Sequence, residues 1–584
     1  MPTSSNANTP ESIRKSYQDW LDSRIQPGID ARRSRLDSLT SKRDVEQWAN
    51  DIKKRFREVT GPLIPLETQN KIFCGQIETK HYRIEKWLYE VMEGTYSAAN
   101  LYVPASLNPS GISIVASLGH WAEGKVTNDY QILGAFMASH GIPVLVYEHQ
   151  GCGERREYWD PLQLKSTVGN SPVCEHSRIG DISVLAGIPL VRFFLTEAEQ
   201  ARRFLAGFDF IDEKKIGITG ASGGGSMTRA AVCYSDAFAF GIPVCIIGGP
   251  AIYTGGCPEQ INWNSALDGL SAVDQLASNV PKPSMIVVEH IDSGALESYA
   301  DLKRVYSAYG APERATDYFQ IHDVHGYTHP MIEAVYRFLS QNFELPTIDP
   351  GLWTTIRLRK PEELWCCPGG FINRARVQTS MQAQVKRQLT AKPSGLSLDS
   401  IKRVLKIDNV KDFNTPALIC GDIRESMEIT GCSQVKDGQI GLIDWTEHEP
   451  AYYHGHGFLY SSNETTQARG LLSLDLNLVG LRTLQILNCL KENPEEIKRP
   501  TASDQWAIPL LFAAALAPKD SFETASVSRL LKSFKACLDA DLTLISMGSV
   551  VHSILKYGDL DDVVALAGDR LLIESRTDPY GRVI

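Results

Sequence analysis

The sequence predicts an α/β fold built around a doubly wound, mostly parallel sheet. From about residue 63 to residue 345, short apolar runs alternate with segments of helical pattern. Within this stretch, Gly220-Ala221-Ser222-Gly223-Gly224 lies between an apolar run typical of a buried strand and a segment typical of a helix. The chain has 584 residues, of which 43% are hydrophobic, so it can form more than one core.

Three regions are expected along the chain. Residues 1–62 form an N-terminal helical segment, residues 63–345 the main α/β domain, and residues 346–584 a second α/β region. The candidate buried positions of the first segment are too few for a core of their own, so we expect it to pack on the main domain or on a second subunit. These positions are Trp20, Leu21, Ile25, Leu36, Leu39, Val45 and Trp48.

The main domain has a strand or helix assigned to each of its apolar segments. Strands are predicted at residues 73–77, 84–89, 98–103, 112–117, 143–147, 215–219, 243–247, 284–288 and 317–321. Helices are predicted at residues 126–139, 185–206, 226–232 and 331–342. Because loops that carry chemistry gather at the carboxyl ends of parallel strands, the residues that follow these strands are the candidates for a site.

Ser222 is the candidate nucleophile. The pattern G-x-S-x-G is that of a nucleophile elbow, a sharp turn between strand and helix that exposes a serine. The glycines on either side permit the turn without a side-chain clash. A serine hydroxyl is a weak nucleophile, so it needs a base close by that takes its proton.

Three histidines follow the last predicted strand and are candidates for that base. We assign His325, because Gly326 lets its loop approach the serine closely, whereas His322 is expected at the strand end and His329 at the start of a helix. A metal bound by His325 and His329 is disfavoured, because no further run of ligands accompanies them.

An acid is needed to orient the histidine. Asp292 follows the strand at residues 284–288 and is our first choice, with Glu259 and Glu289 as alternatives. The chain order is then Ser222, Asp292, His325, which is the order of serine, acid and histidine in α/β hydrolases.

Backbone N–H groups that could stabilise an oxyanion come from two loops. Gly223 directly follows the serine, and His120 or Trp121 would supply the second donor from the loop after residues 112–117. An aromatic substrate pocket is a further hypothesis, with ordinary core packing as its alternative; its candidates are Trp121, Tyr158, Trp159, Tyr253 and Trp263.

The composition argues against several other classes of protein. A formal net charge of −10 and a sequence pI near 5.8 argue against a general nucleic-acid surface. The 12 cysteines include no C-x-x-C pair, so we expect neither a zinc site nor a disulfide framework, and reduced thiols fit a cytoplasmic protein. The first residues are polar and unlike a secretory signal. The uncharged residues 237–258 are interpreted as a buried strand and loop and not as a membrane span, because prolines and glycines interrupt them.

Several motifs together resemble the α/β-hydrolase superfamily, in particular its acetyl xylan esterase-like and prolyl-oligopeptidase-like branch. They are Gly119-His120-Trp121-Ala122-Glu123-Gly124-Lys125, Tyr147-Glu148-His149-Gln150-Gly151-Cys152-Gly153-Glu154-Arg155, the elbow with Gly223-Gly224-Gly225, Cys257-Pro258-Glu259-Gln260 and His325-Gly326-Tyr327. The resemblance implies an esterase or deacylase without metal or organic cofactor. One departure is Leu118-Gly119, where the family has histidine-glycine.

The second region resembles a degenerate copy of the same fold. Residues 415–420 and 439–443 resemble core strands, residues 467–490 the helix before the elbow, and residues 570–575 the strand before Asp578, at the position of the acid. Residues 500–509 replace the elbow without a G-x-S-x-G pattern, so this region is expected to cap the site or mediate assembly and not to catalyse.

These observations predict a serine hydrolase that cleaves a small soluble ester, a lactone or an acylated metabolite through an acyl-enzyme. The same triad could instead serve transacylation, lactone formation or C–C bond hydrolysis. A binding or scaffold protein with an inactive site is the alternative from another class. No nucleic-acid or membrane partner is expected, and a homodimer is one possible assembly.

Overall fold

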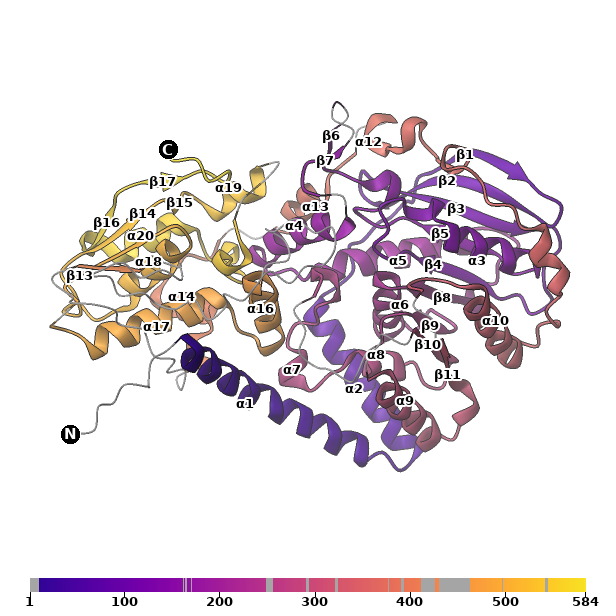
Figure 1. The fold of residues 1–584 in the computed structure, drawn as a ribbon, viewed down its shortest axis with the longest axis horizontal. Helices are drawn as coiled ribbons and strands as arrows, with labels where there is room; N and C mark the ends of the chain where they lie inside the picture. Colours follow the sequence, from indigo (N-terminus) through magenta and orange to yellow (C-terminus); the bar gives the residue numbers. More distant parts are fainter. Residues whose placement is uncertain are drawn as a thin grey trace.

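The fold was determined as a computed structural model. It describes residues 10–160, 162, 165–169, 171–247, 256–289, 294–320, 324–375, 378–389, 393–410, 426–429, 463–495, 497–540, 543 and 545–584. A sheet of nine strands, in the order β1-β2-β3-β5-β4-β8-β9-β10-β11, forms the centre of the larger part of the molecule (Figure 1).

The strands of this sheet confirm the expected series, with ends that differ by a few residues. They are β1 (Lys71–Glu78), β2 (Tyr82–Met92), β3 (Thr95–Pro104), β4 (Ser113–Ser117), β5 (Val144–Tyr147), β8 (Ile216–Ala221), β9 (Gly241–Val244), β10 (Ser284–Glu289) and β11 (Ala315–Gln320). β1 to β3 form an antiparallel meander, and β3 joins β5 antiparallel. From β5 to β11 all pairs are parallel, so the strands that precede the candidate residues end at one edge of the sheet.

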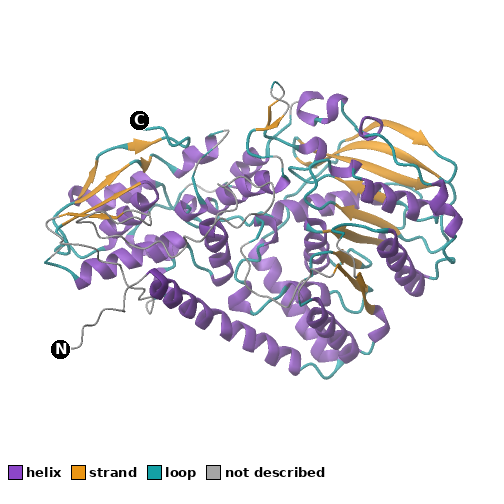
Figure 2. Cartoon of the chain, in the orientation of Figure 1, coloured by secondary structure: helices purple, strands orange, loops and turns teal. Residues whose placement is uncertain are grey.

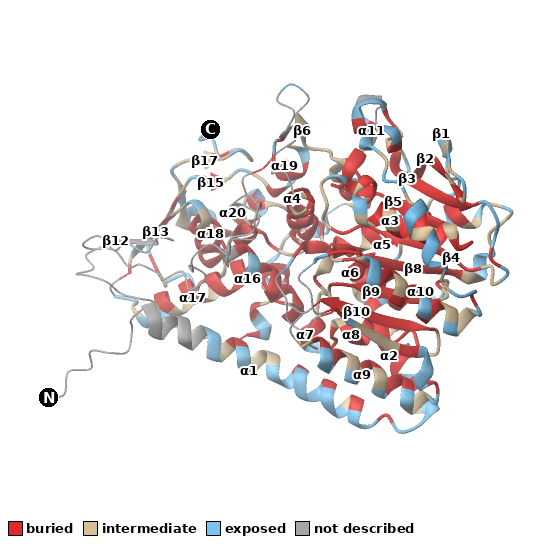
Figure 3. Ribbon diagram, turned by 45° about the vertical axis from the view of Figure 1, so that its right-hand side comes forward, coloured by how far each residue is buried: buried red, intermediate tan, exposed pale blue. Residues whose placement is uncertain are grey.

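Helices cover both faces of the sheet, which explains why its central strands are buried along their whole length and mostly apolar (Figures 2 and 3). α3 (Asn128–Ser139) and α10 (His329–Phe343) contribute to the core on one face. The core on the other face includes residues of α5 (Val191–Ala206), α6 (Gly223–Tyr234), α8 (Ala272–Ala277) and α9 (Ala295–Tyr309).

The N-terminal helices pack on the main domain. α2 (Lys42–Thr60) buries an apolar stripe that includes Val45, Trp48, Ile52 and Phe56 in the core that contains α6 and α9. α1 (Pro10–Asp37) is held by Arg32, whose guanidinium lies 2.8 Å from Asp274 and 2.7 Å from Asp301. The sparse core of residues 1–62 is therefore completed by the main domain.

Two predicted helices differ from the structure, because the chain is broken within the predicted bounds: most of the first is present as α5, and the second is divided into two helices. Residues 185–206 are not one helix: α4 (Pro172–Leu185) ends before Gly187, which has φ +65°, and α5 begins after Pro189. Residues 467–490 are α16 (Asn463–Leu471) and α17 (Leu478–Glu492), separated by a turn in which Asp475 has φ +55°.

The C-terminal region contains a second, smaller parallel sheet, in the order β12 (Ser426–Ile429), β13 (Arg499–Ser503), β14 (Ala525–Ser528), β16 (Leu571–Ile573). α18 (Ala507–Leu516) follows β13 and α20 (Leu560–Ala567) precedes β16. The strand predicted at residues 570–575 is thus present, whereas those at 415–420 and 439–443 lie outside the described residues.

The two parts of the molecule share a buried interface. Arg469 of α16 forms a bidentate ion pair with Asp181 of α4, with N–O distances of 2.9 to 3.0 Å. Arg178, one turn earlier on α4, donates to the backbone oxygen of Ala540 at 3.1 Å. Both arginines are almost fully buried, so these contacts are shielded from solvent.

Among the described residues no single helix is long and apolar enough to cross a bilayer. Two segments, Thr465–Leu474 and Leu478–Glu492, reach the length and apolar content of a membrane span only when they are taken together, and they meet at 91°.

Candidate functional site

Ser222 occupies a strained turn between β8 and α6. Its φ of 56° and ψ of −122° are unusual for a residue with a side chain. The turn is fixed by a 2.8 Å hydrogen bond from the Ser222 N–H to the Val244 oxygen. A Cβ on Gly224 would lie 2.1 Å from the Ser117 oxygen, so only glycine permits this close approach of helix and strand.

His325 lies against Glu289, the last residue of β10. The His325 Nδ1 is hydrogen-bonded to Glu289 Oε1, which requires Nδ1 to carry the proton when the carboxylate is ionised. The Glu289 side chain is 1% exposed, whereas that of His325 is 47% exposed. The buried carboxylate can therefore orient an imidazole whose other nitrogen, Nε2, is left to act as a base.

The two candidate acids that the structure describes, Glu259 and Glu289, contact different histidines. Glu289, one of the two alternatives, is the carboxylate that contacts His325. Asp292, the first choice, lies outside the described residues. Glu259, the other alternative, is directed to a different histidine, with its Oε1 2.8 Å from His120 Nε2.

Two tyrosines fix the loops that meet at the elbow. The Tyr327 hydroxyl lies 2.7 Å from that of Thr219 on β8, and this bond holds the loop of His325 beside the elbow strand. The Tyr130 hydroxyl donates to the Ser117 oxygen at 2.7 Å and accepts from the Ala221 N–H at 3.0 Å, and it thereby joins the ends of β4 and β8. The sequence offered a signal only for Tyr327, which lies in the motif of His325.

The loop after β4 runs between the elbow and the histidine. The Trp121 ring stacks on the His325 ring, with centroids 6.0 Å apart and planes at 23°. A Cβ on Gly223 would lie 2.9 Å from the His120 ring, so the first residue of α6 faces that imidazole. A Cβ on Gly119 would lie 1.8 Å from the Trp121 ring, so glycine is required directly after Leu118, the position where the sequence departs from the family pattern.

A buried ion cluster locks this loop to the loop after β5. Lys125 is fully buried and pairs with Glu154 and with Glu148, the latter at 3.6 Å. Burial raises the pKa of Glu148 to about 7 despite the attraction of Lys125. Gly153 has φ +52°, and a Cβ there would lie 1.9 Å from Glu148 Oε1. The two glycine-containing motifs, residues 119–125 and 147–155, are therefore joined by this ion cluster next to the site.

Cys245 is a neighbour of the histidine that sequence reasoning missed. It directly follows β9 with φ 55° and is buried. Ligand-type atoms of Cys245, Glu289 and His325 lie within 4.8 Å of one another. No pattern in the sequence distinguishes this cysteine from the others, because its position depends on the order of strands in the sheet.

The predicted aromatic residues occupy different places. Trp121 lies at the site, as described above. Tyr158 packs against the small cluster of Val168 and Cys174. The Trp263 ring contacts His552 of the C-terminal region, with centroids 4.7 Å apart, and Tyr253 lies outside the described residues. A shared aromatic pocket stays a prediction.

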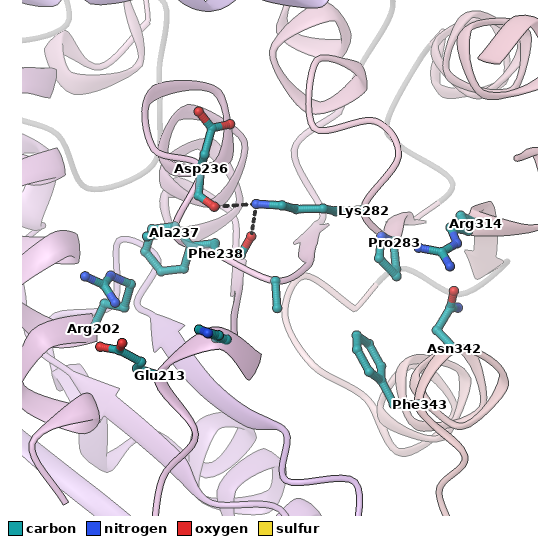
Figure 4. A pocket seen from close by; sticks show the side chains of 12 residues that line it. Arg202, Glu213, Asp236, Ala237, Phe238, Lys282, Pro283, Arg314, Asn342 and Phe343 are labelled. Carbon is teal, nitrogen blue, oxygen red and sulfur yellow. Dashed lines mark hydrogen bonds between the residues drawn. The ribbon is translucent and has the colours of Figure 1, made fainter. Parts of the chain in front are cut away.

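A cavity of about 670 Å³ lies at the opposite, amino-terminal edge of the sheet (Figure 4). Charged side chains line it, and Lys282 donates to the backbone oxygens of Asp236 and Phe238, the latter at 2.9 Å. Because Ser222, Glu289 and His325 follow the carboxyl ends of their strands, this cavity is separate from the candidate site.

The strand order and the strained serine between β8 and α6 define the α/β-hydrolase fold. No protein-family model and no curated protein matches the chain. Solved structures that resemble it include a methylesterase, at 21% identity and a TM-score of 0.48 over 58% of this chain and 73% of its own. An acetyl xylan esterase from Paenibacillus sp. R4 is 16% identical, with a TM-score of 0.34 over 53% of this chain and 98% of its own. A glucuronoyl esterase from Solibacter usitatus is 11% identical, with a TM-score of 0.36 over 50% and 90%. Likenesses as distant as these assign no activity.

Proposed function

We propose that this chain is a serine hydrolase that cleaves a carboxylic ester. The observation that carries the proposal is the contact of His325 Nδ1 with the buried Glu289, in a loop anchored to the strand of a strained serine. In this arrangement Ser222 attacks the carbonyl carbon and His325 Nε2 takes its proton. Glu289 holds the ring and stabilises the imidazolium that forms.

The oxyanion would be stabilised by backbone N–H groups. Gly223 is the first residue of α6, so its N–H lies at the positive end of a twelve-residue helix. The second donor would come from His120 or Trp121, whose loop packs on the elbow. His325 gives the serine proton to the leaving alcohol as the acyl-enzyme forms. It then takes a proton from the water that attacks the acyl-enzyme and returns it to Ser222 as the acid leaves. A small ester, lactone or acylated metabolite remains the proposed substrate.

The assignment of the acid can be tested by two conservative variants. Glu289→Gln removes the charge beside His325, and we expect kcat for p-nitrophenyl acetate to fall by about 10³-fold or more. Asp292→Asn is the matched control, and its activity should stay within about twofold of wild type. If Asp292→Asn loses activity and Glu289→Gln keeps it, the proposed acid is wrong. If neither wild type nor variants hydrolyse any acyl ester, the hydrolase proposal itself fails.

A further inference from the structure

Behind the elbow, four side chains with metal-binding atoms converge. His120 comes from the loop after β4, His176 from α4, and Cys257 and Glu259 flank Pro258 in a short turn, Pro258–Gln260. Their ligand-type atoms all lie within 4.8 Å of one another. His176, Cys257 and Glu259 are buried, and His120 is 15% exposed.

Of three separations among these atoms, two are those of a tetrahedral site and the third is shorter. The Glu259 oxygens lie 2.8 Å from His120 Nε2 and 3.4 Å from His176 Nδ1. The Cys257 sulfur lies 3.5 Å from His176 Nδ1. Bonds of 2.0 to 2.3 Å to a tetrahedral zinc place neighbouring ligand atoms about 3.3 to 3.7 Å apart, so small side-chain movements suffice.

The orientation of His176 is that of a metal ligand. Its Nε2 lies 2.7 Å from the Gln150 backbone oxygen, which can only accept, so Nε2 carries the proton. In the neutral ring the lone pair is then on Nδ1, which points to Cys257 and Glu259. Ligand histidines usually donate their second nitrogen to a carbonyl or carboxylate in this way, which fixes the ring and its tautomer.

Glu259 supplies an independent indication of a ligand. Its Oε2 is buried and makes no hydrogen bond of good geometry among the described residues, and its contact with His176 Nδ1 is 3.4 Å long. A buried carboxylate oxygen without such a bond is costly, and a cation would satisfy it. The turn that presents it is closely packed, because a Cβ on Gly180 of α4 would lie 2.3 Å from the Pro258 ring.

We propose that His120, His176, Cys257 and Glu259 bind a divalent transition-metal ion, with zinc as the best match. Two imidazoles, a thiolate and a carboxylate are ligands that zinc accepts, and the two negative charges balance the ion. Four protein ligands in a buried place make a closed, structural site. The ion would join three segments behind the elbow, including the His120 ring that faces Gly223. This inference does not depend on the proposed hydrolase activity.

The test uses the full chain with any affinity tag removed. After equilibration with zinc and desalting, elemental analysis should give about one zinc per chain. With cobalt(II) in its place, a thiolate-to-cobalt absorption band should appear in the near ultraviolet. Cys257→Ser should lose that band, whereas Cys233→Ser, a buried cysteine of α6, should keep it. Ser222→Ala should bind the same amount of metal.

The zinc content of wild-type protein, shown to be folded by circular dichroism, tests the proposal without any variant. If that protein retains no zinc after desalting, the proposal is wrong. A cobalt band that persists in Cys257→Ser would also overturn it, because the thiolate would then come from elsewhere. A chelator should lower the unfolding temperature of wild type but not of Glu259→Gln, since the ion stabilises only a protein that binds it.

Discussion

In the larger sheet β8 leads through Ser222 into α6, and in the smaller sheet β13 leads through Asp504 into α18. Both strands are central and parallel to their neighbours, and both turns contain a residue with positive φ, 56° at Ser222 and 51° at Asp504. The side chains around the turns differ. Ser222 is followed by three glycines and accompanied by a histidine on a buried carboxylate.

At the second turn the chemistry of a nucleophile is missing. Asp504 accepts a 2.6 Å hydrogen bond from Arg529, and both side chains are largely exposed. Asp578, predicted at the position of an acid, accepts from Arg582 at 2.7 Å in a surface turn. A cavity of about 240 Å³ lies between these groups. The backbone of a strand–turn–helix unit is thus shared by the two regions. Among the described residues, a serine at the turn with a histidine on a buried carboxylate accompanies only the first unit.

The sharpest test of this difference replaces the residue at each turn. Ser222→Ala should lower ester hydrolysis by about 10³-fold or more, because the attacking oxygen is lost. Asp504→Ala should leave kcat and KM within about twofold of wild type. The measurement is steady-state hydrolysis of p-nitrophenyl acetate by both variants. A large loss in Asp504→Ala would mean that the second region contributes to the reaction.

Replacing one glycine in each region by alanine compares how closely the backbone is packed at the two positions. Gly153→Ala should cost about 2 to 4 kcal/mol of unfolding free energy, because the new Cβ meets Glu148 and φ is positive. Gly568→Ala, with φ +62°, ψ −146° and no atom within 4 Å, should cost about 1 to 3 kcal/mol from backbone strain alone, and less than Gly153→Ala because no clash is added. Denaturant unfolding measures both. If both variants lose the same unfolding free energy, the ion cluster of Lys125, Glu148 and Glu154 is not closely packed against Gly153.

Removing the hydrogen bond that holds the loop of His325 should have a smaller effect on stability and activity than the changes above. Tyr327→Phe removes the hydrogen bond to Thr219, and we expect a loss of about 1 kcal/mol in stability. A fall in kcat of a few-fold should accompany it, since His325 is held less firmly. Tyr336→Phe is the control, because its hydroxyl binds the Pro346 oxygen away from the elbow. If both variants show the same kcat, the anchor does not position the base.

The smallest expected effect is a change in the reactivity of Cys74, which lies on the edge strand β1. A hydrogen bond from Cys366 lowers the pKa of the Cys74 thiol to about 7, so its thiolate fraction should rise through half near neutral pH. Alkylation by iodoacetamide should therefore reach half its limiting rate near pH 7. Cys366→Ala should move this midpoint upward, toward the ordinary value of 9.0. An unchanged midpoint would contradict the assigned cause. Peptide mass spectrometry identifies the modified residue.

The sequence predicted the strands and the elbow because apolar runs and glycines directly encode them. It predicted His325 because a glycine and a tyrosine follow it in a short motif. It did not rank the contact of Glu289 with His325 first, because which carboxylate near the end of a strand faces the histidine depends on where that strand ends and which way its last side chain points. Glu289 is the last residue of β10, opposite Gln320 of β11.

Other features depend on contacts between distant segments. Glu259 lies beside His120 and His176 only because the loop after β4, α4 and the turn at Pro258 meet in space. The break between α4 and α5 was missed, although Gly187 and Pro189 are visible signals for it. Trp263 contacts His552 because two regions pack together, which no local pattern encodes.

The central claim is that the first turn alone carries a reactive serine, and a fluorophosphonate probe tests it most directly. The full chain is treated with the probe, and the modified residue is located by peptide mass spectrometry. The account predicts a single adduct on Ser222, which forms more slowly in His325→Ala and is absent in Ser222→Ala. An adduct on another serine, or a folded wild-type protein that does not react, would contradict it.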